Sequence, residues 1–411
     1  MGVQIRYMGA KHRLAPIVSE VIKDLPQGPC LDLFSGMCSV AGSLARTGRE
    51  AWCNDIQQYA ALVSQVLITS SLISLSYKDL CVKLRIHYEK NFNSLKRRFS
   101  KRLREEKEAL KNEDFFKYQE ITTNWRHAGN DEKLFNEIES VRLRSRTPYR
   151  LLTLTYSHGY FGLLQAIDLD SIRYAIDKAY LENEITIEDA QRSIAALLET
   201  ASKICAAPGH FAQYLEPHSG SAYKKIRDCR LKNAWSIFTA SLDRIVPFGN
   251  SNWRSKNRVF CEEASALIKD LRVSNLRPRI IYADPPYSEA QYSRYYHVLE
   301  SIVKYDYPSV FRKGRYREDR FTTPFSLKKS VRSAFDSLAE NSARLKADLV
   351  ISYPSNGLLF EAGESLSEIL YAHYSEIKIS KIDYKHSTLG GRHGIANSEV
   401  EEMIFVARKP R

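Results

Sequence analysis

The amino-acid sequence predicts an α/β protein with a doubly wound, mostly parallel sheet that is split by a large helical insertion. Two observations support this prediction. Short apolar runs alternate with helical patterns near the start of the chain and again after Arg258, and this alternation favours a parallel sheet covered on both faces. From Lys83 to about Asn252, strand signals nearly vanish and helical periodicity replaces them. The sheet should therefore take its first strands from before the insertion and the rest from after it.

The N-terminal part has the pattern of the beginning of a β-α-β unit. An apolar strand is expected over Cys30 to Phe34, and Gly36 permits a tight turn after it. A short helix should follow and end at Gly48, before a second strand over Ala51 to Asn54. The apolar segment from Leu62 to Leu75 contains serine and threonine and is shorter than the about 20 apolar residues that cross a bilayer. We expect it to be a buried helix.

The insertion begins with a long amphipathic pattern. Phe92, Leu95, Phe99 and Leu103 share one helical stripe. The opposite face carries Lys90, Arg97, Arg98, Lys101 and Arg104. Such a face fits a solvated helix surface balanced by nearby glutamates, and it fits a helix that faces DNA about equally well.

Strands return after the insertion, with helical patterns between most of them. They are expected at 259–261, 279–282, 348–352, 377–382 and 402–406, and the helices at 265–271, 331–347 and 366–373. We therefore divide the chain into a split core, residues 1–79 and 256–411, and a helical insertion over residues 80–255 that is a candidate target-recognition domain.

Composition limits the class of protein and its partner. The chain has 411 residues, of which 44% are hydrophobic and 27% charged, as in ordinary globular proteins. Its formal net charge of +13 favours a polyanionic partner such as nucleic acid, with anionic lipid as the alternative. The seven cysteines lack the spacing of a disulfide framework or a zinc site, and the N-terminus lacks an apolar signal segment. We expect a reduced, cytoplasmic protein without a metal.

Two loops that follow predicted strands have the residues of a nucleoside pocket. The first is Asp32-Leu33-Phe34-Ser35-Gly36, where the glycine allows close approach of a ligand to the backbone. The second contains Asp55, about 20 residues further on, where a carboxylate can accept both hydroxyls of a ribose. Cys38 stands at the second glycine position of the dinucleotide pattern G-x-G-x-x-G, which favours a nucleoside without a pyrophosphate.

A third loop, Asp284-Pro285-Pro286-Tyr287, follows the apolar run Ile280 to Ala283. The two prolines restrict the backbone, so that the oxygens of Asp284 and Pro285 become fixed acceptors. Tyr287 offers a face on which a flat base can stack. A proline pair alone usually only ends a strand, but this tetrapeptide after a parallel strand is specific.

These motifs resemble the D12 class of DNA methyltransferases, the Dam-type enzymes that methylate adenine N6. Tyr7-Met8-Gly9-Ala10-Lys11 resembles the N-terminal cofactor motif of that family, Asp32 to Gly36 its glycine motif, Asp55 its ribose carboxylate and Asp284 to Tyr287 its catalytic tetrapeptide. Their order is the α-type arrangement. The resemblance covers about residues 1–75 and 258–411, matches the insertion only loosely, and implies a Rossmann-like methyltransferase sheet.

The resemblance also implies the cofactor and the roles of the residues. S-adenosylmethionine would contact Tyr7, Lys11, Asp32, Phe34, Ser35, Gly36, Asp55 and Asp284, and either Glu262 or Glu263 would meet its adenine. Asp284 and the Pro285 carbonyl would accept the N–H bonds of the target amine, with Pro286 and Tyr287 completing the catalytic motif. The enzyme would act on double-stranded DNA with the target base flipped out, in a restriction-modification or phage-defence setting, with a possible restriction or defence partner.

DNA contacts are expected from loops on the same edge. Candidates are Tyr292, the basic run Arg312, Lys313, Arg315, Arg317 and Arg320, and Arg392 in the loop 386–394. Methylation of cytosine N4 uses the same acceptors and stays open. RNA as substrate and a non-catalytic DNA-binding protein on the same fold are further alternatives. Cytosine C5 methylation is disfavoured, because the only Pro-Cys step, Pro29-Cys30, leads into the first strand.

Overall fold

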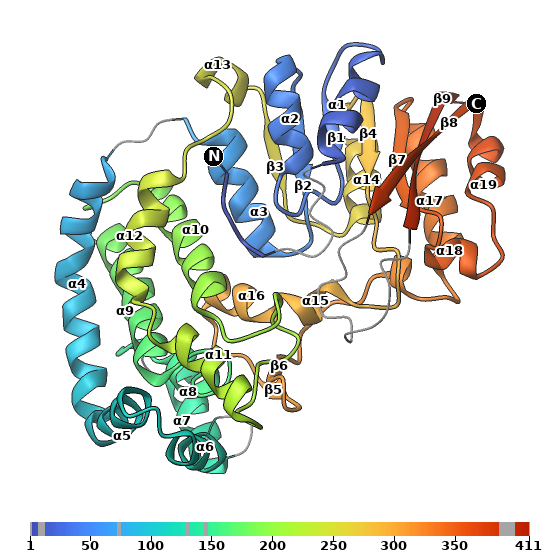
Figure 1. The fold of residues 1–411 in the computed structure, drawn as a ribbon. Coiled ribbons are helices and arrows are strands. Elements are labelled where there is room, and N and C mark those ends of the chain that lie inside the picture. Colours follow the sequence, from blue (N-terminus) through green and yellow to red (C-terminus); the bar gives the residue numbers. More distant parts are fainter. Residues whose placement is uncertain are drawn as a thin grey trace.

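A seven-stranded sheet forms one side of the molecule and a group of helices forms the other (Figure 1). The computed structural model describes residues 2–6, 13–71, 75–125, 127, 131–143, 147–385 and 399–410. The sheet contains β1 (Cys30–Asp32), β2 (Ala51–Asn54), β3 (Arg258–Phe260), β4 (Ile280–Ala283), β7 (Asp348–Pro354), β8 (Tyr374–Lys385) and β9 (Glu399–Pro410). A separate hairpin consists of β5 (Val310–Phe311) and β6 (Tyr316–Arg317).

The strand order β3-β2-β1-β4-β7-β9-β8 confirms a mostly parallel, doubly wound sheet. The first five of these strands pair in parallel, whereas β9 runs antiparallel to both of its neighbours. Leu31 of β1 stands opposite Trp52 on one side and Ile281 on the other. Because β1 lies between β2 and β4, the chain segments before and after the helical insertion meet at the centre of the sheet.

Both faces of the sheet are covered, because successive residues of a strand point to opposite faces. Cys30 and Ile280 pack with α1 (Ala15–Lys23), α2 (Ser39–Thr47), α3 (Gln58–Ser64) and the π-helix η1 (Gln65–Thr69). Leu31 and Ile281 pack with α14 (Ala264–Val273), α17 (Val331–Arg344), α18 (Leu358–Glu361) and α19 (Leu366–His373). The predicted buried helix over 62–75 is therefore observed as the end of α3 together with η1, up to Thr69.

The helical side contains most of the insertion. It consists of α4 (Tyr77–Arg98), α5 (Ser100–Lys111), α6 (Phe115–Thr123), α7 (Glu132–Leu143), α8 (Leu151–Thr155), α9 (Leu163–Leu181), α10 (Ile187–Ile204), α11 (Gly220–Arg230) and α12 (Ala234–Arg244), with α13 (Ser251–Arg254) leading back to the sheet (Figure 1). Leu95 is fully buried, and Phe92, Phe99 and Leu103 pack beside it against Trp125 and Leu163, as the predicted stripe requires. No described helix has the length and apolarity that spanning a membrane would take.

The two sides share one hydrophobic core rather than meeting at a polar boundary. Residues of α9 and α10 belong to the same buried cluster as Val40 of α2 and Ile280 of β4. Two helices that follow β4 in the chain, α15 (Tyr292–Tyr295) and α16 (His297–Lys304), lie between the sheet and the helical side (Figure 1). Helix α16 contacts α3, α10 and β6. Part of the segment 256–411, which the sequence analysis placed in the core, thus packs against the insertion.

Candidate functional site

A pocket opens at the carboxyl ends of the central parallel strands, where ligands bind in open α/β sheets. Its empty volume is about 750 Å³, including open solvent at its mouth. Its walls come from the ends of β1, β2, β3 and β4 and from a later segment of the chain. They are Leu33, Phe34, Asn54, Asp55, Ile56, Gln57, Glu262, Glu263, Ala264, Asp284, Pro286, Tyr292, Phe321, Thr322 and Thr323. The structure therefore brings three sequence-predicted loops to one place.

The loop after β1 is fixed by its backbone. Ser35 donates its N–H to the carbonyl of Asn54 at 2.9 Å, which ties the loop to the end of β2. Gly36 has a φ of +46° and Cys38 a φ of +58°, a left-handed conformation that glycine adopts without strain and other residues rarely adopt. Cys38, which stands where the pattern has a second glycine, takes that conformation and precedes α2 directly.

Asp55 joins this loop to the beginning of α3. Its carboxylate accepts the backbone N–H of Gly36 at 3.1 Å and that of Gln57 at 2.9 Å. Burial raises the pKa of Asp55 to about 6, although both hydrogen bonds act to lower it. Each carboxylate oxygen has a second lone pair, so Asp55 can hold the loop and still accept a ligand hydroxyl.

Acidic side chains line the pocket, and a further one, Asp32, lies behind its wall. Asp32 is buried, and its side chain accepts the N–H of Phe34 at 3.3 Å. Burial and the nearby charges of Asp284 and Asp55 together raise the pKa of Asp32 to about 8, although the hydrogen bond from Phe34 acts to lower it. A ligand with positive charge would relieve this repulsion. The pocket is therefore suited to a cationic or donor-rich nucleoside and not to an anion.

Asn54, which the sequence analysis did not select, holds the pocket together. Its amide group donates to the carbonyls of Leu33 at 3.1 Å and Glu262 at 3.0 Å, and its side-chain oxygen accepts the N–H of Glu262 at 3.1 Å. These bonds join the ends of β1, β2 and β3. The one feature of the sequence that could have indicated Asn54 is that it is a polar residue at the end of an apolar strand.

The two glutamates after β3 have different surroundings. Both line the pocket. Glu263 is the N-cap of α14, and its carboxylate accepts the N–H of Ala266 at 3.0 Å. Glu262 is held by its backbone to Asn54, and its side chain is exposed.

Only part of the tetrapeptide Asp284–Tyr287 after β4 lines the pocket. Asp284 and Pro286 line the pocket, whereas Pro285 is buried. The carbonyl of Tyr287 accepts the N–H of Leu358 at 2.8 Å. The side chain of Tyr287 packs against the hydrophobic cluster that contains residues of α14 and α17. Tyr292, which the sequence analysis named as a candidate DNA contact, forms part of the pocket wall.

Phe321, Thr322 and Thr323 complete that wall, and the sequence analysis missed them. The backbone N–H of Thr323 donates to the side chain of Gln291 at 3.1 Å, and Ser293 donates to the carbonyl of Phe321 at 2.8 Å. The segment therefore lies against α15. No local pattern could identify it, because its role depends on contacts across about 30 residues of chain.

The predicted basic run separates into buried and accessible members. Arg315 is buried and donates to the carbonyls of Thr155 at 2.7 Å and Ser157 at 2.8 Å. Arg317 is buried and pairs with Asp306 at 2.6 Å and Asp319 at 2.8 Å. The predicted phosphate contact does not fit these two arginines, because protein groups already occupy their guanidinium groups and exclude solvent.

Three other members remain at the surface. Lys313 is exposed and pairs with Glu216 at 2.5 Å. Arg312 is exposed and Arg320 is half-buried. Tyr7, Lys11 and Arg392 lie outside the described residues.

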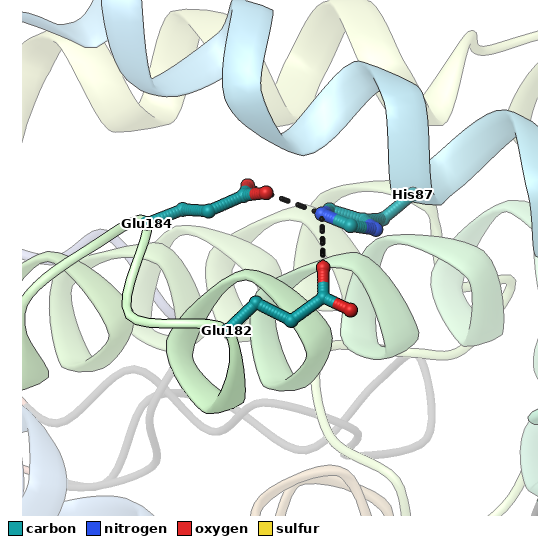
Figure 2. Close-up of side chains that lie close together, drawn as sticks. All are labelled: His87, Glu182 and Glu184. Atoms are coloured by element: carbon teal, nitrogen blue, oxygen red, sulfur yellow. Dashed lines mark hydrogen bonds and ion pairs between the residues drawn. The ribbon is translucent and has the colours of Figure 1, made fainter.

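A cluster distant in sequence from the pocket residues lies on the helical side (Figure 2). His87 of α4 contacts the carboxylates of Glu184 at 3.1 Å and Glu182 at 3.5 Å. These three side chains have the donor types of a metal site, which the sequence analysis did not anticipate. Glu182 also pairs with Lys178 at 2.8 Å. In this structure the contacts join α4 to the connection between α9 and α10.

Comparison with known proteins finds a family model that matches the N-terminal half of these motifs. A model of the D12 class N6 adenine-specific DNA methyltransferases matches residues 7–207. The match includes the loop after β1, Asp55 and the helices up to α10, so it extends through much of the insertion where only loose resemblance was expected.

Curated relatives align over most of the chain. The type II methyltransferase M.FokI of Planomicrobium okeanokoites is 26% identical over 98% of this chain and 53% of its own length. The modification methylase LlaI of Lactococcus lactis subsp. lactis is 23% identical over 81% of this chain and 44% of its own length. The modification methylase StsI of Streptococcus sanguinis is 24% identical over 61% and 35%. The chain spans about half the length, or less, of these three relatives.

Proposed function

Because a model of the D12 class N6 adenine-specific DNA methyltransferases matches residues 7–207 of this chain, we propose that the chain methylates the N6 amine of adenine in double-stranded DNA with S-adenosylmethionine as the methyl donor. One observation carries the proposal. Asp284 and Pro286, at the end of β4, line the same pocket as Asp55 and Phe34, at the ends of β2 and β1. The residues proposed to hold a nucleoside and those proposed to accept the protons of an amine thus line one cavity.

The residues present fit the proposed cofactor. S-adenosylmethionine supplies an electrophilic methyl group on a positively charged sulfur. The carboxylates around the pocket match that charge and the hydroxyl and amine donors of an adenosine. Asp55 would accept from the ribose, and the backbone of Ser35 and Gly36 would border it. Glu262 would meet the adenine, because the carboxylate of Glu263 already caps α14. Tyr7 and Lys11 keep the cofactor roles that the family resemblance gives them.

The chain's own residues would activate the target amine by accepting its protons in hydrogen bonds. The lone pair of an exocyclic amine on adenine is delocalised into the ring, which makes the nitrogen a weak nucleophile. Asp284 and the Pro285 carbonyl would hold the two N–H bonds and favour a tetrahedral nitrogen. No covalent bond to the enzyme forms, so orientation and electrostatics supply the rate enhancement. Tyr292, which lines the pocket, would pack against the flipped base together with Tyr287.

The biological setting that we propose is protection of DNA against a restriction enzyme. Two of the similar proteins are modification methylases by name, and a third is a type II methyltransferase. The helices of residues 80–255 would provide target recognition, and the net charge of +13 fits a DNA partner.

Expression in a host without DNA methylation, followed by single-molecule sequencing, tests the proposal. N6-methyladenine at one recurring sequence is expected for the wild-type chain and should be absent for Asp284→Asn. Asp270→Asn, on the exposed face of α14, is the matched control and should methylate like the wild type. N4-methylcytosine in place of N6-methyladenine would show that the target base is cytosine and not adenine. DNA binding without any methylation would indicate a non-catalytic protein.

A further inference from the structure

The rim of the pocket is built from two chain segments that are fixed to each other. Helix α15 follows the catalytic tetrapeptide, and Phe321 to Thr323 lie against it through the hydrogen bonds from Ser293 and to Gln291. Arg294 follows Ser293 directly, and Arg320 precedes Phe321 directly. The two hydrogen bonds that join these segments therefore place Arg294 and Arg320 next to residues of the pocket wall in the chain.

Aromatic rings hold the guanidinium groups at this rim. The guanidinium of Arg320 lies 5.3 Å from the ring centre of Phe311 and 5.6 Å from that of Tyr316. Arg312 lies 5.7 Å from the same Phe311 ring, and Arg294 lies 5.2 Å from the ring of Tyr295. A cation–π contact is made through the ring face, so most N–H groups of these guanidinium groups can still donate to a ligand, although Arg294 also donates to the Tyr295 hydroxyl at 3.4 Å. We call Arg294, Arg312 and Arg320 the rim arginines.

The rim arginines lack a counter-charge. Within the described ranges, no carboxylate forms an ion pair with any of the three, although basic neighbours do have such partners. Lys304 pairs with Glu300 and Asp319, and Lys313 pairs with Glu216. Burial lowers the pKa of Arg320, and the positive charges of Arg294 and Arg312 lower it further. Three like charges are thus close enough to repel one another, which favours binding of an anion.

We infer that the rim arginines form a binding site for the phosphodiester groups of DNA next to the target nucleotide. This inference rests on the proposed function, and it names residues that would position the substrate strand. A flipped base must enter the pocket from its mouth, so the phosphates on either side of that nucleotide pass the rim. Planar guanidinium groups bind phosphate oxygens through two parallel hydrogen bonds. The rim arginines are positioning residues, because they would act on the backbone and not on the reacting amine.

The test uses the full chain and a short DNA duplex, which contains the methylated sequence if the wild type methylates one and a mixed sequence otherwise. Its affinity is measured over a range of salt concentrations for the wild type and for Arg294→Ala/Arg320→Ala. Each lost phosphate contact should reduce the slope of log K against log salt by about 0.9, and therefore the double variant by about 1.8. Cofactor affinity should stay unchanged, and KM for DNA should rise more than kcat falls. Arg294→Lys/Arg320→Lys should restore most of the slope, because the charges return.

Arg332→Ala/Arg344→Ala is the matched control, since it removes two exposed arginines from α17, where each has a carboxylate partner. An unchanged salt slope in the rim variant, or an equal loss in the control, would overturn the inference. Inorganic phosphate and a duplex RNA of the same sequence serve as competitors. Displacement of DNA by millimolar phosphate would indicate a free-anion site, and preference for RNA would also reject the inference.

The two proposals fail in different ways. A wild-type chain that methylates DNA while the rim variant behaves like the control rejects only the phosphate site. If the wild type methylates nothing but the rim variant has a reduced salt slope, the phosphate site is supported and the proposed function is rejected.

Discussion

Asp55 accepts a hydrogen bond from the backbone N–H of Gly36 at 3.1 Å, and this contact fixes the loop after β1 to the end of β2. The same carboxylate accepts the N–H of Gln57, at the beginning of α3. One side chain thus determines the position of two pocket walls. Asp55, which the sequence analysis predicts as a ligand for ribose, therefore also shapes the site.

Replacing Asp55 should weaken cofactor binding strongly. In the wild type the two carboxylate oxygens of Asp55 accept two backbone N–H groups. In Asp55→Asn an NH₂ group replaces one of these oxygens, and it would face a backbone N–H that it cannot accept. We expect a fall in affinity for S-adenosylmethionine of about tenfold or more, equal to at least about 1.4 kcal/mol, as for a lost charge-assisted hydrogen bond. Isothermal titration calorimetry measures it. Unchanged affinity would show that Asp55 does not border the ligand.

Asn54 and Asn257 form a matched pair for a second prediction. Both are buried, and Asn257 accepts the N–H of Ala51 and donates to Ile68 at the opposite end of β2, each at 2.9 Å. Either change to alanine should reduce the free energy of unfolding by about 1 to 3 kcal/mol, because backbone groups lose their partners. Only Asn54→Ala should reduce cofactor affinity as well. Equal cofactor affinity in the two variants would contradict the role that we assign to Asn54.

Asp32 should make stability depend on pH. Burial is the main cause that raises the pKa of Asp32 to about 8 in the folded protein, above its ordinary value of 3.8. Between these pH values the Asp32 carboxyl is ionised in the unfolded chain and protonated in the folded protein. The free energy of unfolding therefore falls as the pH rises from about 4 to about 8, and Asp32 causes no further loss above pH 8. The stability gained by Asp32→Asn should therefore grow over this range and then level off. Thermal melts from pH 5 to pH 9 measure it, and a constant difference would refute it.

Arg315 and Arg312 should differ in what they stabilise. Arg315→Ala removes donors from two buried carbonyls and should reduce the free energy of unfolding by at least about 2 kcal/mol. Arg312→Ala, at an exposed position nearby, should change it by no more than about 0.5 kcal/mol and weaken DNA binding instead. Chemical denaturation and a DNA-binding assay separate the two effects. A folded, stable Arg315→Ala chain with impaired DNA binding would restore the original prediction for this residue.

The central sheet could be predicted because its signals are local. Buried parallel strands such as Cys30–Asp32 and Ile280–Ala283 are short apolar runs, and each ends at a residue that breaks the run. The carboxyl ends of parallel strands lie on one edge, so the loops at Gly36, Asp55 and Asp284 had to be close together. Segments such as Phe321 to Thr323 have no comparable pattern.

The sequence by itself determined the strands, the edge on which the pocket opens and the carboxylates that line or support it, because these follow from apolar periodicity and from the common direction of parallel strands. Only the tertiary structure decided which arginines face solvent and which polar groups join the strand ends. Arg315 and Arg320 stand five positions apart in one basic run, yet one is buried against main-chain carbonyls and the other is half-buried next to Phe321 of the pocket wall. Burial and hydrogen-bond partners depend on contacts between distant segments, and a local pattern of residues does not contain them.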